Sequence, residues 1–384
     1  QTLGFVGIVS VVVGAIGFLA TGPLLALLPA DPVTAERIVP RAAEYMRVFF
    51  LGSPALFGFF VFSALMRGTG DTRTPLVVMI LSVVVNVALD PFLIFGWWVF
   101  PALGVEGAAI ATVTSRGIAT VAGLYVLFGT DLGPTIDPRD LIPKPGPVRQ
   151  IVELGVPTAL EQSGTALAIV AATAMVATFP PAVVAAYGLG NRLISVVTLP
   201  AMGLSQAMDT AVGQNLGADR PDRARRATWI GVGIAAAALA VIGVVQLLIP
   251  DLLTQVFVPD ISAQGKAYAV RYLEILAYGY WAIGATYMLL AGLNGARRTK
   301  TSLIVDLVKY WGIRLPIAVL ALPVGLGVGA FGLSIAPGLG WGMGAIFWAV
   351  TGSNVAAALG LAAYFKYATS EGMMRRAADV ATAE

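Results

Sequence analysis

The 384-residue sequence contains no cysteine and no histidine, and few of its residues are charged. Without these two residue types the chain offers no disulfide, no thiolate nucleophile, no imidazole base and no Cys/His zinc site. Charged residues make up 12% of the chain and hydrophobic residues 58%, whereas soluble domains carry roughly 25% charged residues. The composition therefore excludes both an ordinary soluble domain and an intrinsically disordered chain.

Motifs typical of enzymes and of nucleic-acid-binding proteins are also missing. The sequence has no G-x-S-x-G nucleophile elbow and no phosphate-binding loop followed by lysine. Its net charge is +3, and the basic residues sit in short loops rather than along one helix face. We therefore predict that the chain is not an enzyme, needs no cofactor and binds no nucleic acid.

Long apolar stretches dominate what is present. Crossing about 30 Å of hydrocarbon takes roughly 20 apolar helical residues, and ten stretches meet this requirement. They are Leu3–Leu28, Tyr45–Met66, Pro75–Trp98, Val105–Phe128, Ile151–Phe179, Val183–Leu216, Ala227–Ile249, Tyr268–Leu293, Ser302–Leu322 and Leu339–Phe365. The sequence predicts an all-α polytopic membrane protein in a lipid bilayer. Pro91 and Pro200 fall inside two of the stretches, where each predicts a kink.

Basic residues in the loops predict the orientation, because Lys and Arg concentrate on the cytoplasmic side. Three of them, Arg37, Arg41 and Lys266, lie on one side of the membrane when alternate loops are compared. The other side holds fifteen: Arg67, Arg73, Arg139, Lys144, Arg149, Arg220, Arg223, Arg225, Arg226, Arg297, Arg298, Lys300, Lys366, Arg375 and Arg376. We expect a multi-pass plasma-membrane protein with both ends of this sequence in the cytoplasm.

The sequence also matches itself at an offset of 227 residues. Pairs fall on turns and span boundaries: Pro23 with Pro250, Pro32 with Pro259, Tyr45 with Tyr272, Gly52 with Gly279, and Gly68 with Gly295. This pattern predicts a duplication whose two halves share one orientation. Spans 151–179 and 183–216 have no counterparts upstream, so we expect a six-plus-six helix protein of which this sequence lacks the first two helices.

Those halves give the expected domains. Residues 1–129 form a first lobe without its first two helices, and 130–150 form a cytoplasmic linker. Residues 151–370 form the second lobe, and 371–384 form a cytoplasmic tail.

Three polar motifs interrupt the apolar pattern. The first runs Gly68-Thr69-Gly70-Asp71-Thr72-Arg73-Thr74-Pro75, which predicts a helix end, a tight turn and a new helix start. The second, inside the next span, is Asn86-Val87-Ala88-Leu89-Asp90-Pro91, followed later by Gly104-Val105-Glu106-Gly107. The third, in the second half, is Gln206-Ala207-Met208-Asp209, which leads into Val212-Gly213-Gln214-Asn215-Leu216-Gly217.

With these motifs, residues 1 to about 370 resemble the multidrug and toxic compound extrusion (MATE) family, within the wider group of oligosaccharide and lipid exporters. The resemblance implies two six-helix lobes that rock between inward-open and outward-open states. It also implies a monomer that exports small organic compounds, often cations, against an inward flow of Na⁺ or H⁺.

Asp90 is the foremost candidate for binding the coupling ion. An ionisable group within a span costs at least about 2.5–3.5 kcal/mol on insertion scales, so it points to function. Asn86 lies one turn earlier on the same face, and Pro91 frees the carbonyl of Val87. Carboxylate, amide and carbonyl oxygens suit Na⁺ or a proton. The alternative is that Asp90 caps a helix break at the membrane interface.

The family resemblance adds Thr112 to this site. Asn86, Asp90 and Thr112 match an ion-binding network of the archaeal and DinF-like branches. Another acidic residue of that network belongs to the first helix of the family, which this sequence lacks, so the expected site is incomplete.

In the second half, Glu161, Gln162, Gln206 and Asp209 are candidates for lining a substrate cavity. Glu161 either attracts cationic substrate or is an early-turn carboxylate favoured by the helix dipole. Thr165 occupies the place where some family members carry an acidic residue. Asp209 and Gln206 share one helix face, where they either line a cavity or pack between helices.

Other charged and aromatic residues have simpler interpretations. Asp306 and Lys309 are three residues apart and are expected to neutralise each other, with Arg314 reaching a membrane interface. Arg116 and Arg192 are interpreted as interfacial or counter-ion residues. Aromatic residues either cage a cation or form an interfacial belt: Trp97, Trp98, Trp281, Trp311 and Trp341.

The leading hypothesis is a secondary-active multidrug antiporter driven by Na⁺ or H⁺. The runner-up is an exporter of lipid-linked oligosaccharide or polysaccharide, which needs a more cationic cavity. Arg116, Arg192, Lys309 and Arg314 keep that alternative open.

Overall fold

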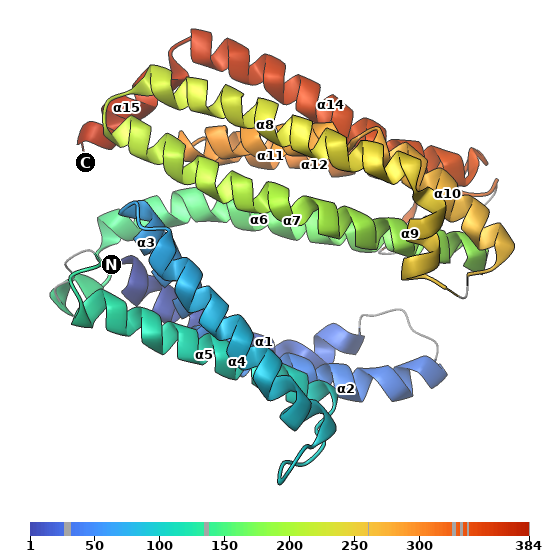
Figure 1. The fold of residues 1–384 in the computed structure, drawn as a ribbon, viewed down its shortest axis with the longest axis horizontal. Coiled ribbons are helices and arrows are strands. Elements are labelled where there is room, and N and C mark those ends of the chain that lie inside the picture. Colours follow the sequence, from blue (N-terminus) through green and yellow to red (C-terminus); the bar gives the residue numbers. More distant parts are fainter. Residues whose placement is uncertain are drawn as a thin grey trace. The chain divides into compact units, whose positions relative to one another are not determined.

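The computed structural model describes residues 1–26, 32–133, 138–259, 261–324, 328–330, 333–335 and 338–383. These residues form two compact units, Gln1–Val152 and Glu153–Glu384. Figure 1 shows that nearly all of the described chain is helical. The end of the first predicted span (27–28), residues 134–137 of the predicted linker and residue 384 of the predicted tail lie outside the described residues.

The first unit is built from five α-helices and a short 3₁₀ turn within its described residues. They are α1 (Thr2–Ala26), α2 (Pro32–Leu51), α3 (Ser53–Gly68), α4 (Arg73–Phe95), α5 (Val105–Gly129) and η1 (Pro138–Leu141). Helix α5 packs against α2, α3 and α4, and α1 packs against α2 and α3. Phe59 and Phe62 of α3 and Ala119 and Leu127 of α5 form the centre of the core.

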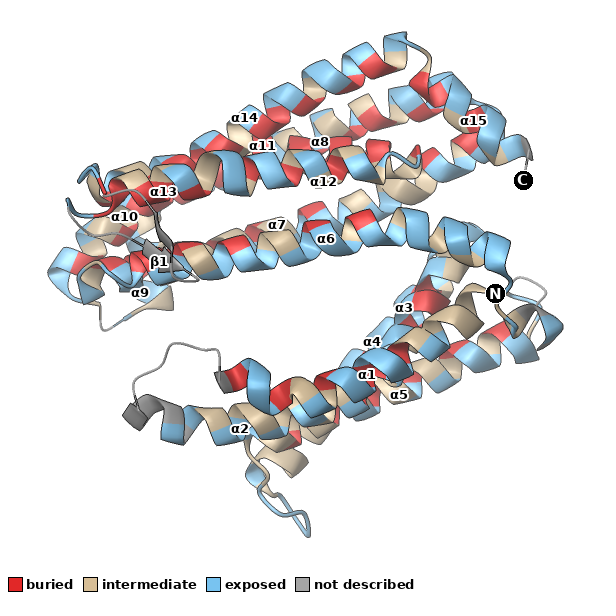
Figure 2. Ribbon diagram, turned by 180° about the vertical axis from the view of Figure 1, so that it is seen from behind, coloured by how far each residue is buried: buried red, intermediate tan, exposed pale blue. Residues whose placement is uncertain are grey.

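The second unit contains the remaining helices. They are α6 (Pro145–Val176), which begins in the first unit, α7 (Pro181–Gly217), α8 (Pro221–Leu248), α9 (Pro250–Phe257), α10 (Ala263–Ala277), α11 (Tyr280–Gly295), α12 (Thr299–Leu307), the π-helix η2 (Val308–Arg314), α13 (Leu315–Ala321), α14 (Gly342–Ser370) and α15 (Met373–Ala383). Helix α11 contacts α7, α8 and α14. Most of its residues are buried (Figure 2), so α11 forms the centre of this unit.

The helices agree with most of the predicted spans. Among the described residues, seven helices are long and apolar enough to cross a membrane: α1, α4, α5, α6, α7, α8 and α14. Counting each of two bent helix pairs as one span raises the number to nine. The tenth predicted span, Ser302–Leu322, is α12, η2 and α13, which follow one another without a break from 299 to 321.

Two predicted spans, Tyr45–Met66 and Tyr268–Leu293, are not single helices as the sequence suggested. Helices α2 and α3 meet at a bend of 51°, and α10 and α11 meet at a bend of 46°. A glycine lies at each break, and neither position has room for a side chain. A Cβ at Gly52 would fall 2.4 Å from the Val113 side chain, and a Cβ at Gly279 would fall 2.9 Å from the Thr351 side chain. Each stretch is long and apolar enough to span a membrane as a bent pair of helices.

A small hairpin contains the two strands found among the described residues. Strands β1 (Val328–Ala330) and β2 (Leu333–Ile335) pair antiparallel, with Val328 opposite Ile335. The hairpin lies between the last two predicted spans, where the sequence predicted only a loop.

Candidate functional site

Asp90 lies on α4, one residue before Pro91, in a helix whose other residues are mostly apolar. Its side chain is half-buried, and among the described residues it forms no hydrogen bond or ion pair. Asn86 lies one turn earlier, and its Nδ2 atom is buried without a hydrogen-bond partner in the described chain. The structure therefore leaves a carboxylate and an amide available on adjacent turns of one span.

Thr112 lies on α5, which packs against α4. The close approach of Gly107 to the Leu93 carbonyl, where a Cβ would fall 2.2 Å away, fixes the register of the two antiparallel helices. Thr112 is five residues from that contact and Asp90 is three residues from it, in the same direction along the two helix axes. The two residues are therefore offset by only ~3 Å along the axes. The Thr112 hydroxyl donates to the Ala108 carbonyl at 2.9 Å, so only its lone pairs remain for a further ligand.

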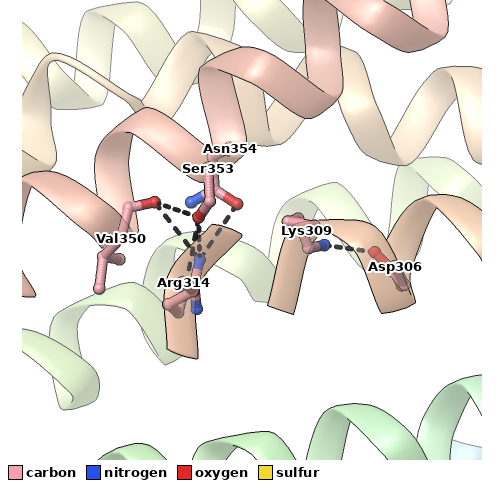
Figure 3. Close-up of polar contacts among 6 residues, drawn as sticks. All are labelled: Asp306, Lys309, Arg314, Val350, Ser353 and Asn354. Atoms are coloured by element: carbon pink, nitrogen blue, oxygen red, sulfur yellow. Dashed lines mark hydrogen bonds and ion pairs between the residues drawn. The ribbon is translucent and has the colours of Figure 1, made fainter. Parts of the chain in front are cut away.

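The second unit holds a cluster of buried charges that we call the charge cluster: Glu161 on α6, Asp306 on α12 and Lys309 on η2. Their exposed fractions are 6%, 9% and 8%. Lys309 Nζ lies 2.5 Å from Asp306 Oδ1, as Figure 3 shows, and this confirms the predicted pairing. The Glu161 carboxyl interacts with both Asp306 and Lys309, while its Oε2 atom has no hydrogen-bond partner among the described residues. One ammonium group thus lies near two carboxyls, of which Asp306 is its ion-pair partner.

Arg314 is held against α14 by hydrogen bonds, and its placement at a membrane interface stays a prediction. Its Nε donates to Ser353 Oγ at 3.2 Å, and its Nη2 donates to the Val350 carbonyl at 3.3 Å and to Asn354 Oδ1 at 3.5 Å. Figure 3 shows these bonds on the α14 side of the guanidinium. The guanidinium carbon also lies 4.5 Å from the centre of the Tyr310 ring.

The other predicted cavity residues do not gather into one buried site. Gln162 and Gln206 are exposed, and Asp209 is half-buried. Helix α7 packs closely on α11 beside Asp209. A Cβ added at Gly295 of α11 would fall only 3.2 Å from the Asp209 carbonyl oxygen. Of the four cavity candidates, Glu161 is the buried one.

The prolines leave their helices continuous. Helix α4 runs through Pro91 and α7 through Pro200 without a break, so a kink at either residue stays a prediction.

Four of the five predicted tryptophan side chains are exposed. They are Trp97, Trp98, Trp311 and Trp341, with exposed fractions from 46% to 91%, whereas Trp281 is partly buried against α11 and α14. Exposed aromatic rings are typical of residues at a membrane interface.

The isolated arginines also differ from each other. Arg116 lies 5.1 Å over the Phe59 ring, and Arg192 is exposed.

Sequence reasoning missed the relation between Lys309 and Arg314. They are five positions apart in the sequence, a spacing that would place them on different faces of an α-helix. The π-helix η2 has hydrogen bonds from i to i+5, so residues five apart come one above the other. Both cations consequently lie near the Tyr310 ring, with Lys309 Nζ 4.6 Å from its centre. The charges themselves were the only signal in the sequence.

The sequence of the chain matches a known protein family. The MatE family model matches residues 1–92 and 157–320, which is about two thirds of the chain. The chain belongs to the MATE family.

Curated relatives of this MATE family transporter are similar over most of its length. It is 30% identical over 329 residues to the probable multidrug resistance protein YoeA of Bacillus subtilis, covering 83% of this chain and 68% of that protein. It is 31% identical over 322 residues to YpnP of the same species, covering 82% and 70%. A FAD transporter of Shewanella oneidensis is 30% identical over 306 residues, covering 80% and 66%. The chain thus spans about two thirds of the length of these relatives.

Solved structures confirm the MATE fold. A MOP superfamily transporter from Pyrococcus furiosus gives a TM-score of 0.83 at 21% identity and covers 96% of this chain and 77% of its own. The MATE transporter VcmN of Vibrio cholerae gives 0.80 at 20% identity, covering 97% and 80%. At these identities the likeness establishes the fold alone.

Several predictions from the sequence are therefore confirmed. The protein is a helical membrane protein of the MATE family, and it is a transporter rather than an enzyme. Its assignment to the archaeal or DinF-like branch stays a prediction.

Proposed function

We propose that this MATE family transporter is a secondary-active antiporter that exports small organic compounds, many of them cationic, against an inward flow of Na⁺ or H⁺. The names of its relatives, two of them probable multidrug resistance proteins, support the substrate class. The excess of basic residues on one side of the membrane supports a plasma-membrane protein with both ends of this chain in the cytoplasm. We take the working unit to be a monomer without a cofactor.

The proposal depends on the position of the Asp90 carboxylate within a span. A carboxylate inside an apolar helix, with no partner among the described residues, raises the free energy of the folded protein unless a bound ligand offsets it. Asn86 adds an amide one turn away, and Pro91 leaves the Val87 carbonyl without its helical donor. These oxygens fit either a proton on Asp90 or a bound Na⁺.

The chemistry of the site limits which ions it accepts. No group of three or more His, Cys, Asp or Glu side chains in the described ranges has the geometry to hold a metal. A single carboxylate with neutral oxygens suits a monovalent ion rather than a divalent one. Proton or Na⁺ binding would neutralise Asp90 and so change the relative free energies of two states of the transporter.

Coupling then follows from differential affinity, since a ligand shifts an equilibrium only by binding one state more tightly. In the proposed cycle, the ion binds Asp90 from outside and favours the state that releases substrate. The two lobes then alternate access, and the ion leaves to the cytoplasm when the next substrate binds.

Efflux from vesicles under separately imposed gradients tests the proposal. The transporter is reconstituted, the vesicles are loaded with ethidium, and an inward Na⁺ gradient or an inward proton gradient is applied. We expect efflux under one gradient and its loss in Asp90→Asn. The Asn amide carries no negative charge that could attract a proton or Na⁺.

Asp251→Asn is the matched control, because Asp251 is an exposed carboxylate that pairs with Lys266 at 2.9 Å. This variant should keep native efflux. Unchanged gradient-driven efflux in Asp90→Asn would overturn the role of Asp90. Absence of efflux under either gradient would overturn the antiport proposal and favour the exporter of lipid-linked oligosaccharide or polysaccharide.

A further inference from the structure

Two adjoining cavities lie within the second unit. The smaller has a volume of about 70 Å³ and is lined by Lys309, Tyr310, Arg314 and Thr286 among others. The larger has a volume of about 170 Å³ and shares Tyr310 and Arg314 with the first. Its other lining residues are mainly apolar or aromatic, including Tyr187. Together the cavities offer a small polar compartment next to a larger apolar one.

The lining of both cavities is positively charged. Lys309 and Arg314 line the smaller cavity and Arg314 lines the larger, while no Asp or Glu among the described residues lines either one. Asp306, which lies outside the lining, pairs with Lys309. It therefore balances the charge of Lys309 rather than that of Arg314.

Arg314 lacks such a balance. Within the described part of the chain, no carboxylate lies within ion-pair distance of its guanidinium. Its Nε and Nη2 atoms are bound to α14, whereas its Nη1 atom donates to no described residue. A guanidinium has five N–H donors in a planar fork, so the edge carrying Nη1 is left for a ligand. The charge and the free donors both favour an anionic group.

Thr286 supplies an independent indication. It lies on α11 with an exposed fraction of 4%, and its Oγ1 atom has no hydrogen-bond partner among the described residues. Buried hydroxyls are normally bonded. Because Thr286 lines the same cavity as Lys309 and Arg314, a ligand in that cavity would satisfy it.

The π-helix explains how this lining arises. Its i to i+5 pattern brings Lys309 and Arg314 to one side of the helix, with the Tyr310 ring close to both. In an ordinary α-helix the two cations would point to different faces, and the cavity would carry one positive charge.

We propose that the second unit binds an organic carboxylate, with the carboxylate on Arg314 and Lys309 in the smaller cavity and the apolar body beside Tyr310 and Tyr187 in the larger. As a substrate site it rests on the export function proposed above and adds amphipathic organic acids, zwitterions included, to the substrate class. As a binding site it stands on these cavities alone.

Equilibrium binding to the purified, full-length transporter tests the proposal without any ion gradient, so a failure of antiport leaves this test unaffected. The probe is radiolabelled benzoate, compared with its neutral isostere benzamide and with the cation benzylamine. We expect benzoate to bind at least roughly ten-fold more tightly than benzamide, since hydrogen bonds to charged groups are worth more than neutral ones. Equal binding of benzoate and benzamide, or tighter binding of benzylamine, would overturn the proposal.

Variants then locate the site. Arg314→Gln should weaken benzoate binding at least roughly ten-fold, and Arg314→Lys should retain part of it. Arg116→Gln is the matched control, because Arg116 also lies over an aromatic ring but in the first unit. Thr286→Val removes one hydroxyl and should weaken binding by a few-fold, which keeps the test decisive if Arg314→Gln fails to fold. Native benzoate affinity in both Thr286→Val and Arg314→Lys, or a loss in Arg116→Gln as large as in Arg314→Gln, would contradict this location.

Discussion

Gly52 and Gly279 occupy the same place in the two halves of the chain. Each lies between two helices that meet at a bend, of 51° at Gly52 and 46° at Gly279. Their backbone angles are close, with φ −79° and ψ −1° at Gly52 and φ −98° and ψ −6° at Gly279. The helices that follow, Ser53–Gly68 and Tyr280–Gly295, have 16 residues each.

The packing around these helices repeats as well. Helix α3 contacts α1 and α5 in the first unit, and α11 contacts α8 and α14 in the second. The offset found in the sequence thus corresponds to a repeated arrangement, in which a bent pair of helices is followed by equivalent neighbours. This repetition is expected for a transporter built from duplicated halves.

Substituting these glycines should destabilise the protein unequally. In Gly52→Ala the new Cβ would lie 2.4 Å from Val113 Cγ1, whereas in Gly279→Ala it would lie 2.9 Å from Thr351 Cγ2. Overpacking of this kind costs about 1–3 kcal/mol, and we expect Gly52→Ala at the upper end. The apparent melting temperature of the purified protein in detergent measures the difference.

Two further variants control this prediction. Gly68→Ala should leave the melting temperature nearly unchanged, because no atom lies within 4 Å of its added Cβ. Gly52→Ala with Val113→Ala should recover part of the loss by making room. Equal melting temperatures for Gly52→Ala and Gly68→Ala would show that the close approach to Val113 does not limit the fold.

The spans were predictable because their signal is local: each is a run of apolar residues long enough to cross a membrane. The bends at Gly52 and Gly279 were not, because each depends on a side chain from a distant helix that leaves no room for a Cβ. The matching of the two glycines at the offset of 227 was visible in the sequence. Only the structure reveals that a bend is what they share.

Within the charge cluster, Lys309→Met should be the most destabilising single substitution. It leaves Glu161 and Asp306 buried together without a cation, and breaking a buried pair costs about 3–5 kcal/mol. Asp306→Asn should cost less, since the amide oxygen can still accept a hydrogen bond from Lys309 and Glu161 no longer faces a second carboxylate. Melting temperatures of the two variants and of the double variant give the coupling between them.

The exposed pair Arg271 and Glu274 supplies the comparison. Their N–O distance is 3.5 Å, and both side chains are at least a third exposed. Removing either charge should change stability by no more than about 0.5 kcal/mol. Additive effects of Lys309→Met and Asp306→Asn, as small as those of Arg271 and Glu274, would refute the charge cluster as a coupled unit.

Asp71 should make the start of α4 sensitive to acid. Hydrogen bonds from the side chain and backbone of Thr74 hold the pKa of the Asp71 carboxyl below its ordinary value; the backbone bond is 3.1 Å long, and Arg73 N donates at 2.9 Å. A lowered pKa in the folded state adds stability at pH values above the unfolded pKa of about 3.9, and this stability is lost as the pH falls through the folded value.

Comparison with Asp71→Asn tests this pH dependence. At pH 7 the native protein should be the more stable by a few tenths to about 1 kcal/mol, because Asp71 is only partly buried and solvent screens its charge at the helix start. The difference in melting temperature should shrink as the pH falls below about 4. A difference that stays constant from pH 7 to pH 3 would argue against a charged cap.

The candidate sites were predictable to different degrees. Asp90 and Asn86 stood out because both are polar and lie one turn apart in an apolar stretch. Glu161 was assigned to a cavity or to a helix start, and the structure instead brings it against Asp306, which is 145 residues later in the sequence. That contact depends on helix packing, and the alignment of Lys309 with Arg314 depends on a π-helix, so neither follows from local periodicity.

Ion movement driven by substrate is the most direct test of antiport at Asp90. Vesicles carrying the transporter are loaded with ethidium and diluted into medium without ethidium, with no ion gradient, and the uptake of ²²Na⁺ and of protons is recorded. We predict uptake of one of the two ions in step with ethidium efflux, and its loss in Asp90→Asn but not in Asp251→Asn. Ethidium efflux without uptake of either ion, or equal ion uptake in Asp90→Asn, would contradict the account.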